Sequence, residues 1–432
     1  MARGRIFVDL DPFRKYPQFL LLWSGFLVRT IGNQLTVVAV PIQVFRLTHS
    51  SFEVGLVSLV QLGPLLVGSL LGGTIADNFD RRRVLMFTQV LLALTSVGLA
   101  LNSGAAHPGL LPLFLCSAAA AGFQGVASPA STAFVVNLVD RNTIVGANAL
   151  WQVLFQVGQV AGPGLAGLLL IHFSISVVYW IDVATYVISL ATVLGLRKTV
   201  TAVRETAREL GFSAMVGGLR YLRNNQPLQG IFLADLVAMI LGMPRALFPA
   251  MGLVRFHGTN FTVGLLYAAP GVGALVGALL TGWVQRVRRT GLAVLIAVAG
   301  WGVSILAFGV APWLGVALFF LGLAGAFDVF SAVFRGAILQ LVTPRPLIGR
   351  MQAVQIAVVT GGPRLGDMEH GALAALAGTE FSVVSGGLAC IIGVVVLARA
   401  LPRFARLTVT KGVVDEGTDT LEVAVPESGA VP

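Results

Sequence analysis

The chain has 432 residues, of which 56% are hydrophobic and only 11% are charged, and its formal net charge at pH 7 is +10. A soluble domain carries about 25% charged residues. This composition therefore excludes water as the main solvent of the folded chain and predicts an integral membrane protein.

Long apolar runs follow one another from the N-terminus to the C-terminus. About 20 apolar residues in a helix cross a hydrocarbon core of roughly 30 Å. The sequence contains twelve such segments, near residues 17–45, 52–75, 84–104, 110–136, 146–171, 176–196, 227–253, 261–284, 291–311, 313–340, 348–376 and 381–401. The expected fold class is an all-α membrane protein with twelve transmembrane helices.

The basic residues are distributed unevenly between the segments that connect these spans. With the N-terminus placed inside, 23 of the 29 Lys and Arg residues fall in inner segments, against Arg46 and Arg255 outside. This asymmetry predicts a multi-pass protein of the bacterial cytoplasmic (inner) membrane with both termini in the cytoplasm. It also accounts for the net charge, so we expect the lipid bilayer and no nucleic acid as a partner.

A sequence pattern recurs after 209 residues, inside apolar stretches. Its first copy is Val54, Gly55, Gly68 and Gly73, and its second copy is Val263, Gly264, Gly277 and Gly282. Internal repeats are typical of secondary transporters, in which the site lies between two bundles. We therefore expect two pseudo-symmetric six-helix bundles, related about an axis along the membrane normal.

The expected domains follow from this division. The segment between the sixth and seventh spans is long and charged, and the end of the chain is acidic with few large apolar residues, which does not favour a packed core. We expect an N-terminal bundle at 1–196, a cytoplasmic central loop at 197–226, a C-terminal bundle at 227–401 and a disordered cytoplasmic tail at 402–432.

The loop after the second span combines a glycine, an acid and a basic cluster, namely Gly73, Asp77, Arg81, Arg82 and Arg83. This segment resembles the signature loop between helices 2 and 3 of the major facilitator superfamily, with Asp80 where that pattern usually has Gly. A glycine permits close helix approach, and an acid can meet a helix N-terminus or an arginine. The resemblance implies a gating loop; the alternative is that the arginines only set topology.

The fifth span carries Gly158, Gly162, Pro163 and Gly167. This pattern resembles the superfamily's antiporter motif, which accompanies exporters; its alternative role is helix packing alone. In the fourth span, Ala121 stands where many proton-coupled members have Arg, so that route of coupling has no support.

Further segments, such as 38–43, 266–274 and Gly349-Arg350, resemble the enterobactin (siderophore) exporter branch of the superfamily. The resemblance runs from about residue 13 to 401. It implies export from the cytoplasm, by an inner-membrane carrier, of a siderophore or a similar amphiphilic aromatic compound.

Charged residues inside the spans are candidates for the transport pathway, because each is costly unless it faces a cavity or a partner. At 1.5 Å per residue, Arg29 and Asp328 lie within roughly 3 Å of the midpoints of spans 1 and 10, and Asp235 and Arg245 lie roughly 7 Å either side of the midpoint of span 7. Helices 1, 4, 7 and 10 line the cavity in the superfamily that this chain resembles. Arg335 shares a face with Asp328, and its alternative role is a structural ion pair.

The eleventh span carries the densest polar cluster, with Arg364, Asp367 and His370 spaced one turn apart. If a proton is coupled, Asp367 with His370, Asp235 and Asp328 are the candidates, since these groups can take up and release a proton. An interfacial polar network is the alternative.

Together these features predict a secondary active transporter, a proton-coupled exporter of siderophore-like or amphiphilic drug-like small molecules that works by alternating access as a monomer. No Walker-type loop is present, which favours the proton motive force over ATP, and we expect no cofactor and no metal. No nucleophile triad or metal pair appears in the spans, so we do not expect an enzyme. A broad multidrug or lipid carrier is the alternative, and a non-transporting membrane sensor or enzyme is a more distant one.

Overall fold

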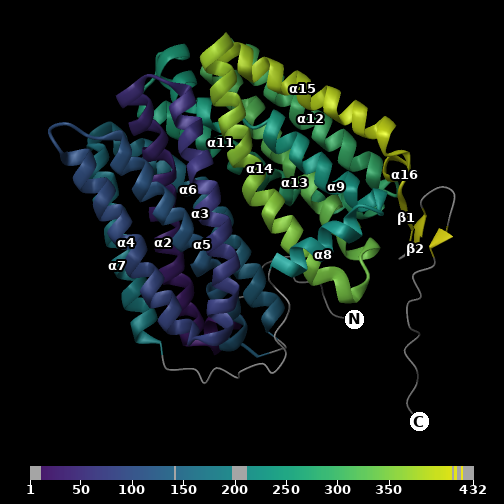
Figure 1. Cartoon of the computed structure of the whole chain (residues 1–432), viewed down its shortest axis with the longest axis horizontal. Helices are drawn as coiled ribbons and strands as arrows, with labels where there is room; N and C mark the ends of the chain where they lie inside the picture. The colour runs from purple at the N-terminus through teal and green to yellow at the C-terminus, as the bar shows by residue number, and fades with distance from the viewer. Residues whose placement is uncertain (1–10, 141–142, 197–211, 411–412, 416–419, 422–432) are drawn as a thin grey trace. The chain divides into compact units, whose positions relative to one another are not determined.

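The computed structural model describes residues 11–140, 143–196, 212–410, 413–415 and 420–421. This part of the chain is almost entirely helical (Figure 1). Within it, eleven helical segments are long and apolar enough to cross a membrane. A further helix, α14 (Ile348–Ala377), has the length but carries the polar cluster predicted for the eleventh span.

The chain divides into two compact units, which are described separately. Unit 1 comprises Met1–Gly211, Arg245–Gly271 and Gly371–Thr379, and unit 2 comprises Phe212–Pro244, Val272–His370 and Glu380–Pro432. Two segments from the second half of the sequence therefore belong to unit 1. The sequence boundaries 1–196 and 227–401 remain a prediction.

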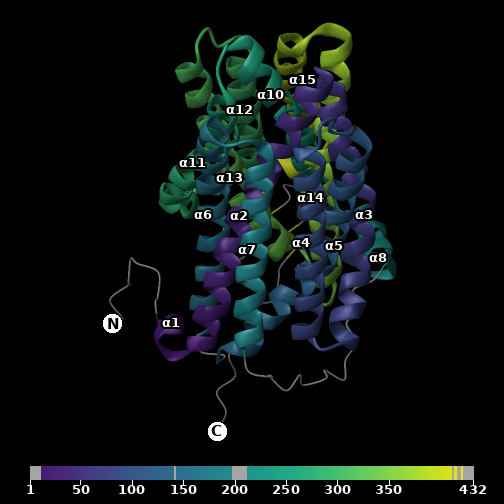
Figure 2. The same cartoon turned by 90° about the vertical axis from the view of Figure 1, so that its left-hand side faces the viewer.

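Unit 1 is built around six long helices, α2 to α7, which run alongside one another (Figures 1 and 2). Helix α3 packs on α5, α2 packs on α6 and α7, and α4 packs on α5 and α7. The helices are α1 (Asp11–Lys15), α2 (Pro17–Thr48), α3 (Ser51–Asn78), α4 (Arg81–Gly104), α5 (Leu110–Leu138), α6 (Ile144–His172) and α7 (Ile175–Gly195). Unit 1 also contains η2 (Arg245–Leu247), α10 (Phe248–Ala250), η3 (Met251–Arg255) and the first part of α11 (Asn260–Leu279).

Side-chain caps define several of the short turns between these helices. The hydroxyl of Ser50 accepts the backbone N–H of Glu53 at 3.4 Å, at the start of α3. The carboxylate of Asp80 accepts the N–H of Arg82 at 2.8 Å, at the start of α4. Each cap satisfies an N–H that has no partner within its own helix. Asp80, which departs from the signature pattern, therefore has a local role as a helix cap.

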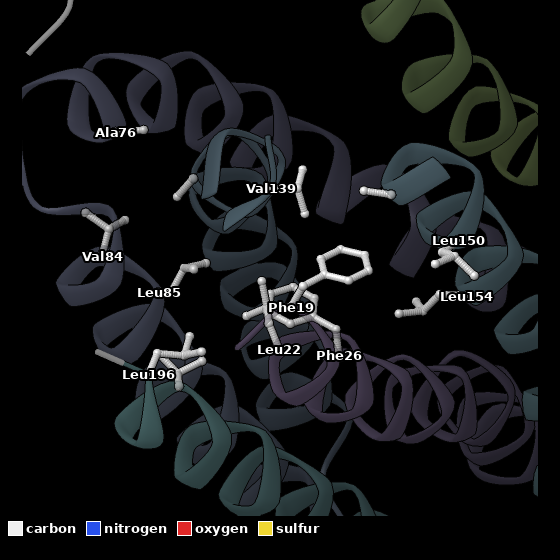
Figure 3. Packing of buried hydrophobic residues seen from close by; sticks show 13 residues of the cluster. Phe19, Leu22, Phe26, Ala76, Val84, Leu85, Val139, Leu150, Leu154 and Leu196 are labelled. Atoms are coloured by element: carbon white, nitrogen blue, oxygen red, sulfur yellow. The ribbon is translucent and has the colours of Figure 1, made fainter. Parts of the chain in front are cut away.

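The core of unit 1 is formed by large side chains from several helices (Figure 3). Phe19 and Leu22 of α2 are fully buried, as are Leu85 of α4 and Leu154 of α6. Phe26 lies 5.1 Å from the ring of Trp151, measured between ring centroids. In lipid, close packing of this kind drives helix association, since the surrounding lipid tails are as apolar as the side chains.

Unit 2 contains the remaining elements. Helix α12 packs on α13, and α9 packs on both. The elements are α8 (Phe212–Leu222), α9 (Gln226–Leu236), η1 (Val237–Leu241), η4 (Thr281–Arg286), α12 (Thr290–Val310), α13 (Leu314–Val342), η5 (Arg345–Leu347), most of α14, α15 (Thr379–Ala400, from Glu380) and α16 (Pro402–Ala405). Part of the predicted central loop is thus the helix α8, while residues 197–211 lie outside the described part of the chain.

The predicted tail contains three short strands, β1 (Thr408–Thr410), β2 (Val413–Asp415) and β3 (Thr420–Leu421), paired antiparallel in the order β1-β2-β3. Thr408 is the partner of Asp415 in the first pair. The other residues after Thr410 lie outside the described part of the chain.

The repeated glycines make the same kind of helix contact in both units. A Cβ atom added at Gly68 of α3 would collide with the carbonyl oxygen of Gly122 in α5. In unit 2, a Cβ atom at Gly277 of α11 would lie 2.9 Å from the Cα atom of Ala326 in α13. Only glycine allows backbones to approach this closely. The sequence repeat therefore encodes equivalent helix crossings.

Candidate functional site

Unit 2 contains an ion-paired cluster formed by α9 and α13. The guanidinium of Arg335 pairs with the carboxylate of Asp235, and its Nη2 atom lies 3.6 Å from Oδ1 of Asp328. The side chains of Arg335 and Asp235 are 11% and 8% exposed, whereas that of Asp328 is 40% exposed. Arg335 therefore has one buried carboxylate partner on a neighbouring helix and a more accessible one on its own helix.

The backbone that follows Asp235 is not a continuous helix. Helix α9 passes into the π-helical turn η1, and residues 242–244 are not helical. Trp301 on α12 donates its Nε1–H to the carbonyl oxygen of Gly242 at 2.7 Å, which satisfies a backbone group left free by the interruption. The predicted span at 227–253 corresponds to the apolar segment Gln226–Arg255. Its helix is interrupted at Gly242 and Pro244, two residues that disfavour a continuous helix.

This interruption matters for function because discontinuous helices are typical of transporter sites. It places Asp235 one residue before the end of the regular helix α9. Beyond the break, Arg245 begins η2, which belongs to unit 1. Its backbone carbonyl accepts the hydroxyl of Tyr267 at 3.0 Å. Its Nε atom is buried, with no hydrogen-bond partner among the described residues.

The polar cluster of α14 is anchored to α15. His370 is fully buried. Its Nδ1 atom lies 3.1 Å from the hydroxyl of Ser382, which itself donates to the carbonyl oxygen of His370 at 3.0 Å. Oε2 of Glu369 lies 3.5 Å from the same Nδ1 atom. Ser382 is a member of this cluster that sequence reasoning missed, since nothing in its spacing ties it to α14.

The other two members of the predicted cluster lie on the same helix. Arg364 donates from Nη1 to the carbonyl oxygen of Thr360 at 2.9 Å, and Asp367 is buried, with 6% of its surface exposed. The α14 cluster therefore combines a cation, a buried acid and a buried imidazole.

Unit 1 contains a second buried carboxylate, that of Asp182 on α7, which is only 1% exposed. Its Oδ2 atom accepts the hydroxyl of Thr36 on α2 at 2.7 Å and that of Ser96 on α4 at 2.8 Å. Thr185 adds a longer contact to Oδ1, at 3.4 Å. Asp182 therefore joins three helices. Sequence reasoning left it out of the candidate site, and its only signal was an acid within an apolar span.

Arg29 lies on α2. Its Cζ atom is 4.6 Å from the centroid of the Phe26 ring. Tyr186 and Asp182 are the acidic groups close enough to interact with it electrostatically. One turn further along α2, the side chain of Asn33 accepts a hydrogen bond from the amide of Gln124 on α5. These residues form a polar layer inside unit 1.

The predicted gating loop joins α3 to α4. Arg82 donates from Nε to the carbonyl oxygen of Val193 at 3.0 Å and from Nη2 to that of Leu194 at 2.6 Å. It thereby caps the last turn of α7, whose carbonyls have no partner within the helix. Gly73 and Asp77 lie near the end of α3, and the side chain of Asp77 lies outside the described part of the structure. Arg81 is half-buried and Arg83 is exposed.

The glycines of the antiporter-type motif contact two helices. Cβ atoms added at Gly158 and Gly162 would collide with Thr30 and Gln34 of α2. A Cβ atom at Gly167 would lie 3.0 Å from the Cα atom of Gly264 in α11. Pro163 lies between these positions, inside α6. The motif therefore allows α6 to pack closely on α2 at Gly158 and Gly162, and on α11 at Gly167.

Next to this contact, the start of α11 is held by side-chain hydrogen bonds within unit 1. Arg46 of α2 donates from Nη2 to Oδ1 of Asn260 at 2.9 Å, and Asn260 donates from Nδ2 to the carbonyl oxygen of Leu170 in α6 at 2.9 Å. In the described residues, no group of three His, Cys, Asp or Glu side chains could hold a metal ion.

The apolar helices and the buried charges between them define a multi-pass membrane carrier. Solved structures with the same fold include the nucleoside transporter NupG, with a TM-score of 0.72, 12% identity and coverage of 90% of this chain and 98% of that one. A bacterial homologue of the lysosomal transporter Spinster has a TM-score of 0.68 and 15% identity, and covers 92% of this chain and 97% of that one. The predicted fold class, the twelve-helix architecture of the major facilitator superfamily, is confirmed.

The model of the transmembrane secretion effector family matches residues 8–421, and the chain belongs to this family of major facilitator transporters. Among its relatives, the enterobactin exporter EntS of Salmonella choleraesuis (strain SC-B67) is 27% identical over 417 residues, which cover 96% of this chain and 100% of the relative. The enterobactin exporter EntS of Escherichia coli O81 (strain ED1a) is 28% identical over 391 residues, or 90% of this chain and 93% of the relative. These relatives and fold neighbours are transporters rather than enzymes, as the sequence predicted.

Proposed function

We propose that this protein exports siderophore-like or similar amphiphilic small molecules from the cytoplasm across the bacterial inner membrane, by alternating access. The observation that carries the proposal is the end-to-end similarity to exporters of enterobactin, which covers 96% of this chain and all of the relative. Similarity over the full length includes both halves and the signature loop, not one shared motif. At 27% identity, the proposal extends to the general class of substrate and not to the exact compound.

The orientation of the proposed carrier rests on the distribution of charge. Of the Lys and Arg residues, 23 fall in segments that lie inside when the N-terminus is inside, against two outside. This excess favours both termini in the cytoplasm. The direction of transport is then outward, as the names of the relatives state for those proteins.

The proposed energy source is the proton motive force, and the cluster of Asp235, Arg335 and Asp328 is the proposed point of coupling. One guanidinium faces two carboxylates there. A proton that binds Asp235 removes the negative charge that holds Arg335, which frees the guanidinium to pair with Asp328. The change of partner alters the contact between α9 and α13, next to the break at Gly242. Release of that proton to the cytoplasm restores the first pair.

The test of this function is proton exchange in everted membrane vesicles that carry the protein. An acidic interior is established, and catecholate siderophores, dyes and antibiotics are added one at a time. Collapse of the pH gradient by a siderophore, absent from vesicles without the protein, supports proton-coupled siderophore export. Collapse by many unrelated compounds indicates a broad multidrug carrier. Accumulation of labelled compound without collapse contradicts the proton coupling, and no accumulation of any siderophore contradicts the substrate class.

A further inference from the structure

Arg29 has no counter-ion of its own among the described residues. No hydrogen bond or ion pair joins its guanidinium to another described residue, and its Nη1 atom is buried and without a partner. Its Cζ atom lies over the ring of Phe26, a residue of the core cluster labelled in Figure 3. A guanidinium carries five N–H donors. Leaving such a charge unpaired inside a membrane protein is costly, which is why intramembrane charges mark functional positions.

Asp182 is the nearest carboxylate, but it does not serve as the partner of Arg29. Its oxygens accept hydroxyl groups from Thr36, Ser96 and Thr185, at 2.7, 2.8 and 3.4 Å. These bonds hold the carboxylate between α2, α4 and α7. Asp182 acts on Arg29 only through space, as a charge at longer range. The hydrogen-bonding capacity of the guanidinium therefore remains unused within unit 1.

The residues around Arg29 could form hydrogen bonds to a polar group of a ligand. Asn33 and Gln124 are joined to each other one turn away, and the hydroxyl of Tyr186 lies within hydrogen-bonding reach of Gln124. These groups are neutral and can donate or accept. Phe26 covers the guanidinium from one side, and Trp151 extends the aromatic surface behind it. A bound molecule would thus meet one cation, neutral amides and aromatic rings.

The arginine of unit 2 provides a contrast. Arg335 is partly buried, as Arg29 is, but it has Asp235 and Asp328 as partners. Two intramembrane arginines thus have opposite chemistry: one is neutralised by the protein and the other is not. The unneutralised one attracts negative charge.

Resting on the export function proposed above, we propose that the guanidinium of Arg29 binds a carboxylate of the exported molecule. Asn33 and Gln124 supply neutral hydrogen bonds beside it. The substrate class is accordingly an acidic, aromatic amphiphile rather than a cationic drug.

The experiment is a binding measurement on the full-length protein in lipid nanodiscs, by titration calorimetry at pH 7. The probes are 2,3-dihydroxybenzoyl-L-serine, which carries a carboxylate, and its carboxamide, which does not. Wild-type protein should bind the acid about 10- to 100-fold more tightly, the range of one charge-assisted hydrogen bond. Arg29→Gln should remove that preference and leave the affinity for the amide unchanged. Lys15→Gln, which removes a positive charge of unit 1 from an exposed pair with Asp11, should retain it.

A second variant covers the case in which Arg29→Gln does not fold. Arg29→Lys keeps the charge but lacks the planar fork of the guanidinium, so it should keep the preference for the acid with several-fold weaker binding. The proposal is overturned if wild-type protein does not prefer the acid, if Arg29→Gln keeps the preference, if Lys15→Gln loses it, or if Arg29→Lys binds the acid as tightly as wild-type protein.

The same probes in everted vesicles distinguish this proposal from the export function. If binding of the acid depends on Arg29 but neither probe accumulates, the export function is wrong and the binding site stands. If acid and amide accumulate equally in wild-type and Arg29→Gln vesicles, export stands and the role of Arg29 is wrong.

Discussion

Arg335 on α13 pairs with Asp235 on α9. Its Nη2 atom also lies 3.6 Å from Oδ1 of Asp328, which precedes it on the same helix. A single guanidinium therefore stands between a buried carboxylate and a more exposed one. The buried pair joins two helices next to the interruption at Gly242, so its strength bears on how α9 and α13 pack. This relationship makes the proposed coupling testable one residue at a time.

Asp235→Asn should lower the rate of proton-coupled export about tenfold or more. The neutral amide cannot bind and release a proton, so it cannot switch the pairing of Arg335 on and off. Substrate exchange without a pH gradient should be much less affected, since binding does not require the proton. Asp328→Asn leaves the pair of Asp235 and Arg335 in place and should have a smaller effect. The measurement is siderophore-dependent proton flux in everted vesicles, compared with counterflow in the same vesicles.

Asp11→Asn is the control for this series, because it removes a carboxylate from an exposed pair with Lys15. It should transport as the wild-type protein does, since exposed pairs contribute little. Normal coupled flux in both Asp235→Asn and Asp328→Asn, at equal membrane abundance, would remove this cluster from the transport pathway.

Arg335→Gln should lower the stability of the protein, because it leaves the buried carboxylate of Asp235 without a partner. Breaking a buried ion pair in this way costs about 3–5 kcal/mol. The double variant Asp235→Asn/Arg335→Gln has no uncompensated buried charge at this pair and should recover much of that loss, without recovering coupled transport. Thermal unfolding in detergent measures the stability, and proton flux in vesicles measures the coupled transport. If the double variant is as unstable as the sum of the single ones, the two side chains do not interact as described.

The sequence was sufficient for the architecture because hydrophobic length, charge distribution and the repeat are properties of the chain itself. It also identified Asp235, Asp328 and Arg335 as charges within spans. The contact between Asp235 and Arg335 joins residues 100 positions apart in sequence, and no spacing predicts it.

The same limit explains what was missed in unit 1. Asp182 is held by Thr36 and Ser96, which are 146 and 86 residues away, so its network becomes visible only when α2, α4 and α7 are packed together. Asp80 is a different case. Its departure from the signature pattern is explained by a local cap at 2.8 Å, and a sequence signal for such a cap exists, since Asp is favoured at helix N-termini.

Ser96→Ala should destabilise unit 1, because it removes one of the hydroxyls that Asp182 accepts. A hydrogen bond to a charged group contributes about 1.5–3 kcal/mol, and Thr36→Val should have an effect of similar size. Ser24→Ala is the matched control, since its hydroxyl bonds only to the carbonyl oxygen of Leu21 in its own helix. Thermal unfolding of the three variants measures the difference. Equal melting temperatures would show that Asp182 does not depend on these hydroxyls.

Gly167→Ala should weaken the contact between α6 and α11, because the added Cβ atom would lie 3.0 Å from Cα of Gly264 and 3.2 Å from the carbonyl oxygen of Phe261. Backbone atoms move less easily than a side chain, so the two helices must separate, at a cost of about 1–3 kcal/mol. Transport should fall along with stability, since the contact lies in the antiporter-type motif.

Gly164→Ala provides a matched control in the same helix, because a Cβ atom there meets nothing within 4 Å. Replacing a helical glycine by alanine without a collision should stabilise the helix by about 0.5–1 kcal/mol. The two variants should therefore shift the melting temperature in opposite directions. A loss of transport in Gly167→Ala with unchanged stability would instead assign the motif a role in the transport cycle beyond packing, whereas identical behaviour of the two variants would contradict the close approach of α6 and α11.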